Sequence, residues 1–179
     1  MPSTTLGKQR SIYVAQGETA VERAPDVVMM AVLGSCVSVC LYDPQARIGG
    51  MNHVLLSHRS AIKDRPDFSA AASMEILINS LLKAGARKSR FTASVVGGAN
   101  MEERLGPIGH ANVQGVMSFL KNEEIHVTSQ DTGGTRARRV RFHPESGRVL
   151  VRTVSDSPAE PVSVKPPMPN RSSSDFELF

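Results

Sequence analysis

Residues 26–56 read DVVMMAVLGSCVSVCLYDPQARIGGMNHVLL, and the secondary structure of this segment constrains the rest of the domain. It contains two apolar, β-branched runs, 27–33 and 37–41, which Gly34-Ser35-Cys36 separates. Asp43-Pro44 then gives a turn signal before a further apolar run. Short apolar runs bounded by turn residues indicate strands, so the segment predicts a strand, a tight elbow, a second strand and a hairpin partner.

The register of this hairpin decides which side chains meet. A type I turn about Pro44-Gln45, with proline at its favoured second position, places Cys36 directly opposite His53. Opposed residues of an antiparallel pair have Cβ atoms roughly 4.5 to 5.5 Å apart, so a thiol and an imidazole would meet there. A bulge at 45–47 or at Gly49-Gly50 would shift this register by one residue.

A cysteine beside a histidine has the chemistry of a nucleophile and its base. The thiolate is the reactive form, and a neighbouring imidazolium lowers the pKa of a cysteine from its usual value of about 8.5. A buried cysteine in a strand is alternatively a small core residue. Gly34 and Ser35 favour catalysis by Cys36, because they allow a turn that exposes the thiol. Cys40 lies four residues on, and core packing is favoured for it over a metal site or a disulfide.

Composition bounds the class of protein. The chain has 179 residues, 40% of them hydrophobic and 4% aromatic, which predicts one globular domain and a tail. The net charge of +4 favours an acidic partner. Two cysteines indicate a reducing compartment. Since no run has signal-peptide or membrane-span character, we expect a cytoplasmic protein with no membrane insertion.

The remaining pattern predicts an α+β domain rather than a doubly wound sheet. We expect a loose N-terminus at 1–10, a domain at 11–153, and a disordered, proline- and serine-rich tail at 154–179. Further strands are predicted at 11–15, 90–96, 125–129, 138–143 and 148–153, helices at 67–85 and 112–122, and a connection at 16–25.

Two other features have a structural and a functional interpretation. Gly97-Gly98 permits a close backbone approach to another segment or to a substrate, and is equally typical of a simple turn. Arg139 and Arg141 alternate with Val140 and Phe142, which is typical of a solvated sheet face. Nucleic-acid binding is disfavoured, because no aromatic platform accompanies the arginines.

Five motifs in order resemble the CheD family, the chemoreceptor glutamine deamidases of bacterial chemotaxis. They are LGSCVSVCLYD, GGMNHVLL, VVGGANM, IGHANV and DTGGTRARRVRFHPESGRVLVR, and the resemblance covers roughly residues 12–152. It implies a three-layer α/β/β fold similar to cytotoxic-necrotizing-factor-like deamidases. It also implies Cys36 as the nucleophile and His53 as the base in converting receptor glutamines to glutamate with release of ammonia.

The resemblance implies partners as well as chemistry. These are the cytoplasmic domains of chemoreceptors and a CheC-type phosphatase. The cluster of arginines is either a surface that steers the protein toward acidic receptor helices or a solubilising face. The reaction needs no metal and no organic cofactor. Backbone N–H groups of residues 34–36 (Gly34, Ser35 and Cys36) are the expected donors to the oxyanion.

One position departs from the family pattern. The family usually has a threonine six residues before the cysteine, thought to orient the histidine, and this chain has Met30 there. A thioether donates no hydrogen bond and accepts weakly, so Ser35, Ser38, Asn52 or a backbone carbonyl must substitute. Otherwise the protein is a slow enzyme or a binding module that regulates receptors or a CheC-type phosphatase. A cysteine hydrolase acting on another amide is a third interpretation.

The tail ends in Asp175-Phe176-Glu177-Leu178-Phe179. These residues resemble the C-terminal pentapeptide with which some chemoreceptors recruit their modifying enzymes. An apolar tip on a polar segment indicates a docking peptide, since exposed phenylalanine gives a disordered segment no advantage. The alternative is an end without function.

Overall fold

The computed structural model describes residues 9–55, 70–101 and 106–154. One sheet consists of β1 (Arg10–Tyr13), β3 (Val27–Leu33), β8 (Arg138–His143) and β9 (Arg148–Thr153), in the order β1-β3-β8-β9. The other consists of β2 (Thr19–Glu22), β5 (Ile48–Asn52), β4 (Val37–Asp43), β6 (Thr92–Gly97) and β7 (His126–Thr132), in the order β2-β5-β4-β6-β7. The helices are α1 (Ala70–Lys83), α2 (Ile108–Asn122) and the short 3-10 turn η3 (Lys88–Arg90).

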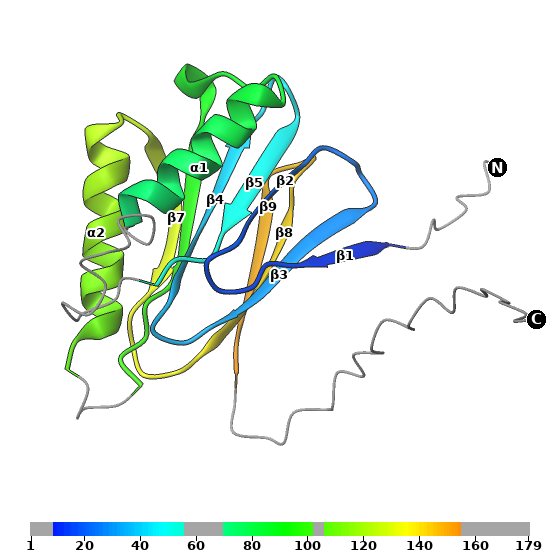
Figure 1. The fold of residues 1–179 in the computed structure, drawn as a ribbon. Coiled ribbons are helices and arrows are strands. Elements are labelled where there is room, and N and C mark those ends of the chain that lie inside the picture. The colour runs from blue at the N-terminus through cyan, green and yellow to red at the C-terminus, as the bar shows by residue number, and fades with distance from the viewer. Residues whose placement is uncertain (1–8, 56–69, 102–105, 155–179) are drawn as a thin grey trace, which may run out of the picture.

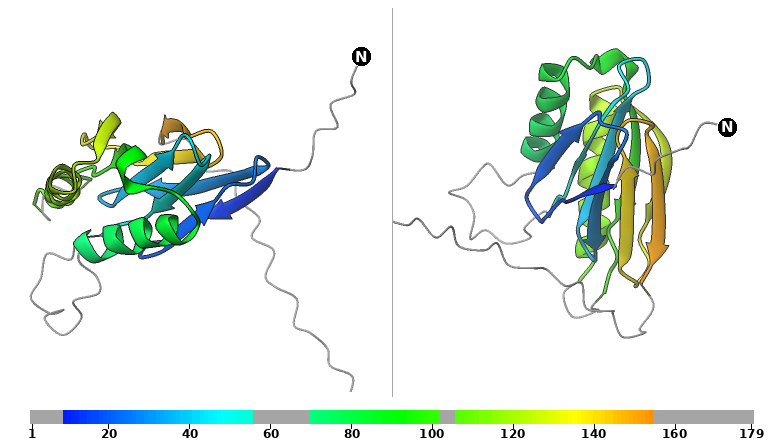
Figure 2. Two further views of the ribbon diagram at one scale, coloured as in Figure 1. Left: turned by 90° about the horizontal axis from the view of Figure 1, so that it is seen from above. Right: turned by 90° about the vertical axis from the view of Figure 1, so that its right-hand side faces the viewer.

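The elements form three layers, as Figures 1 and 2 show. Both long helices cover one face of the five-stranded sheet, where Leu41, Leu77 and Leu120 are among the buried residues. The four-stranded sheet covers the other face, around a second core that includes Met29, Met51 and Phe142. The predicted α+β class and its helix-sheet-sheet layering are therefore confirmed. No helix within the described ranges is long and apolar enough to span a membrane.

Most elements lie where the sequence predicts them, and the β8–β9 hairpin has the predicted bounds. Strand β2 was not predicted, because only four residues of the 16–25 connection are extended and they carry two apolar side chains. Helix α2 starts at Ile108 rather than Asn112. The predicted start of the first helix near residue 67 and the predicted tail lie outside the described residues.

The predicted β4–β5 register is wrong by two residues. Cys40 pairs with Met51 and Val37 bridges to Val54, so His53 lies opposite Ser38 rather than opposite Cys36. The turn is longer than a two-residue type I turn because it includes Arg47 with a φ of 52°, and the carboxylate of Asp43 accepts the N–H groups of residues 45 and 46. Since strand side chains alternate with period two, this shift changes the partner but not the face of the sheet.

Candidate active site

Cys36 lies in the link that carries the chain from one sheet to the other. This elbow, residues 34–36, joins β3 of the four-stranded sheet to β4 of the five-stranded sheet. The Cys36 side chain is half-buried and packs against the core between the sheets. Burial raises the pKa of its thiol, an effect that the Cys36 backbone N–H partly offsets. The Cys36 thiol is therefore neutral at pH 7.

All three elbow carbonyls accept a hydrogen bond from outside the elbow. The Gly98 N–H donates to Cys36 (2.8 Å), the Ala99 N–H donates to Gly34 (2.9 Å), and the Asn112 Nδ2 donates to Ser35 (2.6 Å). Within the described ranges, no acceptor is recorded for the Ser35 N–H, whereas the Cys36 N–H donates to its own sulfur. The elbow thus has fixed carbonyls, the Ser35 N–H with no acceptor recorded in the described ranges, and the Cys36 N–H beside the sulfur, and such donors suit an oxyanion.

The paired glycines at the end of β6, Gly97 and Gly98, allow the chain to approach the elbow closely enough for these hydrogen bonds. A Cβ on Gly97, whose φ is 112°, would lie 2.3 Å from the Cys36 carbonyl oxygen. Gly109 in the first turn of α2 approaches equally closely, since its Cβ would lie 2.4 Å from the carbonyl oxygens of Gly98 and Ala99. The close-approach interpretation of the paired glycines is therefore correct. The roles of Gly109 and Asn112 were missed, because their partners lie far away in sequence.

His53 is 5% exposed, and the loop between β1 and β2 holds it. Its Nδ1 lies 3.0 Å from the carbonyl oxygen of Val14, its N–H donates to Glu18, and its carbonyl accepts the N–H of Gly17. Because a carbonyl only accepts, Nδ1 must carry the proton and Nε2 has the free lone pair. Burial lowers the pKa of His53, and the bond to Val14 partly offsets this, so the ring is neutral at pH 7.

The side chains that the sequence offered for orienting His53, those of Ser35, Ser38 and Asn52, lie elsewhere or make other contacts. The hydroxyl of Ser38 donates to the carbonyl of Asn52, and the Asn52 side chain contacts the Val39 N–H and helix α1. Ser35 borders a cavity instead. The family threonine is absent from this chain, and the sequence offers four substitutes for it. The one that contacts His53 in the structure is a backbone carbonyl, that of Val14.

Met30 lies on the outer face of the four-stranded sheet. It pairs with Tyr13 and Arg141, which are both exposed, whereas its neighbours Met29 and Ala31 are buried between the sheets. Its side chain thus points away from the core that Cys36 contacts. Met30 affects His53 only through its backbone, since its carbonyl accepts the N–H of Val14 at 2.8 Å.

Cys36 and His53 lie on the same side of the five-stranded sheet but are not directly opposed. The bridge from Val37 to Val54 makes them diagonal neighbours, a relationship with Cα atoms typically about 7–8 Å apart. Within the described ranges, no hydrogen bond between their side chains is recorded.

Cys40 is 2% exposed and lies in the core between the two sheets, where burial raises the pKa of its thiol. Neither Cys36 nor Cys40 forms a disulfide.

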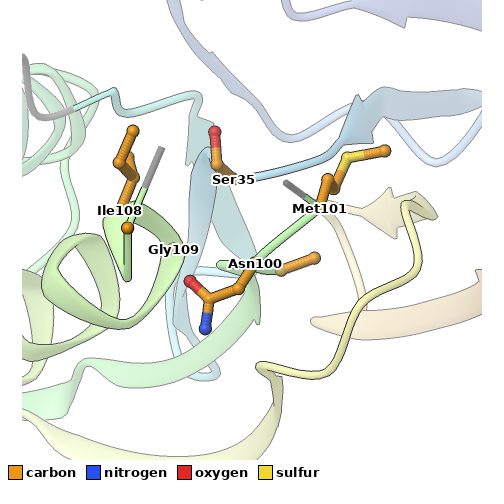
Figure 3. A pocket seen from close by; sticks show the side chains of 7 residues that line it. Ser35, Asn100, Met101, Ile108 and Gly109 are labelled. Carbon is orange, nitrogen blue, oxygen red and sulfur yellow. The ribbon is translucent and has the colours of Figure 1, made fainter. Parts of the chain in front are cut away.

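A cavity of about 210 Å³ opens beside the elbow. Ser35 borders it on one side, Asn100 and Met101 after β6 border it on another, and Ile108 and Gly109 close it with the first turn of α2 (Figure 3). Its walls are largely apolar apart from Ser35 and Asn100. The cavity thus adjoins the elbow at Ser35, and Cys36 is not among the residues that line it.

Comparisons with known proteins identify the family of the chain. The family model described as CheD, chemotactic sensory transduction, matches residues 56–153. The "Probable chemoreceptor glutamine deamidase CheD" of Caulobacter vibrioides is 45% identical, over 94% of this chain and 92% of its own length. The protein of the same name from Cereibacter sphaeroides is 44% identical over 78% and 70%.

One solved structure, the hypothetical protein YfiH of Bacillus licheniformis, aligns at 14% identity over 72% of this chain and 61% of that one, with a TM-score of 0.45. The family model covers more than half of the chain, and the two CheD proteins align with most of it at 44–45% identity. The chain belongs to the CheD family.

Proposed function

We propose that this protein deamidates glutamine side chains in the cytoplasmic domains of chemoreceptors, with Cys36 as the nucleophile and His53 as the base. The names of its relatives support the reaction and the substrate. The observation that carries the assignment of residues is the elbow. It presents a half-buried thiol beside its own N–H and beside the Ser35 N–H, which has no acceptor in the described ranges, on the sheet face that His53 shares.

The reaction follows from these groups. Nε2 of His53 takes the proton of the Cys36 thiol as sulfur attacks the carboxamide carbon of the glutamine. The N–H groups of Ser35 and Cys36 donate to the oxyanion, and one such donor is typically worth about 2.7–4 kcal/mol. The imidazolium then protonates the departing amine, which leaves as ammonia, and a thioester remains. Water that has lost its proton to His53 cleaves the thioester, releasing glutamate and the thiol.

Because Cys36 and His53 are diagonal neighbours, substrate binding has to bring the thiol and the imidazole closer together. Catalytic hydrogen bonds are often long in the free enzyme and shorten in the substrate complex. Because Val14, Gly17 and Glu18 hold His53 in place, the Cys36 side chain is the partner that moves. A receptor segment seated in the cavity beside Ser35 would bring the carboxamide between the two groups.

Mass spectrometry of a chemoreceptor cytoplasmic fragment tests the proposal. The fragment is incubated with the wild-type protein, with Cys36→Ala or with Cys40→Ala, and released ammonia is measured in parallel. We expect glutamine-to-glutamate mass increases with the wild type and with Cys40→Ala, the matched control for loss of a thiol, and none with Cys36→Ala. Deamidation that persists without Cys36 would refute the assignment.

A binding module is the second candidate, and one observation favours it. The described structure records no hydrogen bond between the side chains of Cys36 and His53. In this case the protein would bind receptors, or a CheC-type phosphatase, without turnover. Binding of the receptor fragment with no ammonia release, unchanged by Cys36→Ala, would establish the module and exclude the enzyme.

A further inference from the structure

The outer face of the four-stranded sheet carries four arginines without a carboxylate partner among the described residues: Arg139, Arg141, Arg148 and Arg152. Arg139 and Arg152 are directly opposed on β8 and β9, an arrangement in which like charges repel. The positive field also reaches His143. Its pKa is lowered first by burial and then by Arg141 and Arg148.

Strand β9 is the free edge of this sheet. It pairs only with β8, so the backbone groups on its other side have no strand partner within the described structure. On the inner side of the sheet, Val149 and Val151 pack at the margin of the core and are only half-buried. The edge thus offers unpaired backbone groups, an apolar inner side and a cationic outer side.

Asp175-Phe176-Glu177-Leu178, near the end of the tail, has the complementary pattern. Acidic and apolar residues alternate with period two, so an extended conformation places Asp175 and Glu177 on one side and Phe176 and Leu178 on the other. Next to β9, the carboxylates would lie beside Arg148 and Arg152. The apolar pair would cover the two half-buried valines.

The connection is long enough for this pairing. Twenty residues separate Val154, at the end of β9, from Asp175. A chain of that length reaches at most roughly 66–72 Å when fully extended, against about 20 Å for the length of β9. Tethering also gives the segment an effective concentration in the millimolar range. Edge arginines discourage pairing with most strands, whereas an acidic strand neutralises them.

We propose that residues 175–179 of this chain add to the free edge of β9 as a fifth strand of the outer sheet. Strand addition is an established mode of peptide binding, in which backbone bonds give affinity and alternate side chains give specificity. In this arrangement Asp175 and Glu177 contact the arginines on the outer face of the sheet. Phe176 and Leu178 pack on the inner face, toward the core. This inference is independent of the deamidase proposal.

Amide hydrogen exchange by NMR on the full-length protein tests it. We expect at least tenfold faster exchange of alternate β9 amides in the variant Phe176→Ser/Leu178→Ser. The control Val162→Ser/Val164→Ser makes the same change elsewhere in the tail and leaves those amides protected. Equal exchange in the wild type and in Phe176→Ser/Leu178→Ser would overturn the proposal.

Charge reversal gives a second readout. Asp175→Arg/Glu177→Arg should also speed exchange of the β9 amides, and adding Arg148→Glu/Arg152→Glu should restore protection. Failure of this rescue would refute the pairing of charges. Protection that rises with protein concentration would overturn the proposal as well, because the fifth strand would then come from a second copy.

Discussion

The carbonyl oxygen of Val14 lies 3.0 Å from Nδ1 of His53, and this one bond fixes which ring nitrogen carries the proton. Val14 is in turn held by the carbonyl of Met30 through its N–H. The orienting group is therefore a backbone atom, which a change of side chain at residue 30 does not remove.

Replacing Met30 with threonine should leave the deamidation rate unchanged within about twofold. The threonine hydroxyl would lie on the outer face of the sheet, next to Tyr13 and Arg141. Steady-state ammonia release with a receptor fragment measures this. A large acceleration would mean that the imidazole lacks an orienting partner in the wild type.

Replacing Gly17 with alanine should slow deamidation, because the N–H of Gly17 bonds the His53 carbonyl and its φ is 83°. The left-handed conformation costs alanine about 1–2 kcal/mol, which the loop would relieve by moving. Gly85→Ala is the control, since Gly85 also has a positive φ but lies after helix α1. Equal effects of the two changes on kcat would argue against the loop as a positioning element.

Replacing Gly97 with alanine should both destabilise the fold and disrupt the elbow. The new methyl would lie 2.3 Å from the Cys36 carbonyl oxygen, and overpacking together with backbone strain costs about 2–5 kcal/mol. Gly134→Ala is matched for positive φ but has nothing within 4 Å, so it should cost only the strain. Urea unfolding separates the two variants, and equal midpoints would contradict the close approach.

Alkylation of Cys36 and the activity of the protein should depend on pH as expected for a neutral thiol beside a neutral imidazole. Burial raises the pKa of the Cys36 thiol above 9.0, so alkylation by iodoacetamide should keep rising as the pH passes 9. The pKa of His53 is lowered below 6.5, so the acid limb of kcat/KM should have its midpoint below pH 6.5. An alkylation plateau near neutral pH would instead reveal a preformed thiolate–imidazolium pair.

Asp43 should contribute to stability at neutral pH and lose that contribution in acid. Burial raises the pKa of its carboxyl, but hydrogen bonds from Arg90 and from backbone N–H groups outweigh burial and lower the pKa to about 2. With an unfolded value of 3.8, the stabilisation is complete above pH 3.8 and is lost as the pH falls through 2. It amounts to about 2 kcal/mol.

Chemical denaturation of Asp43→Asn between pH 2 and 7 measures this contribution. The variant should be less stable than the wild type at pH 7 and should show a flatter decline in acid. Asp131→Asn is the control, because Asp131 forms an ion pair while half-exposed. A parallel acid decline in Asp43→Asn and the wild type would exclude Asp43 as the titrating group.

Sequence patterns predicted the α+β class and the elbow well, because both depend on local periodicity and glycine placement, whereas the layering was implied by the family resemblance. The hairpin register failed because the left-handed Arg47 lengthens the turn, and no sequence rule marks an arginine for that conformation. The start of α2 was missed because Gly106-Pro107-Ile108-Gly109 has the composition of a loop, whereas Gly109 is a packing contact with Gly98 and Ala99.

The orienter of His53 could not be found from the sequence, since every residue has a carbonyl. Only the fold shows that the carbonyl of Val14 lies next to the imidazole. Met30 illustrates the converse. Its residue type suggested a defect, but the register with Tyr13 and Arg141 shows that its side chain is on the other face of the sheet.

Cys36 and His53 both depend on the seam between the two sheets. The elbow crosses from β3 to β4, and His53 follows β5 of one sheet while the Val14 carbonyl that orients it follows β1 of the other. Neither sheet alone contains every part of the candidate site. Deamidation is therefore a reporter of late folding: in a refolding experiment, secondary structure should return first and activity should return only when the two sheets dock.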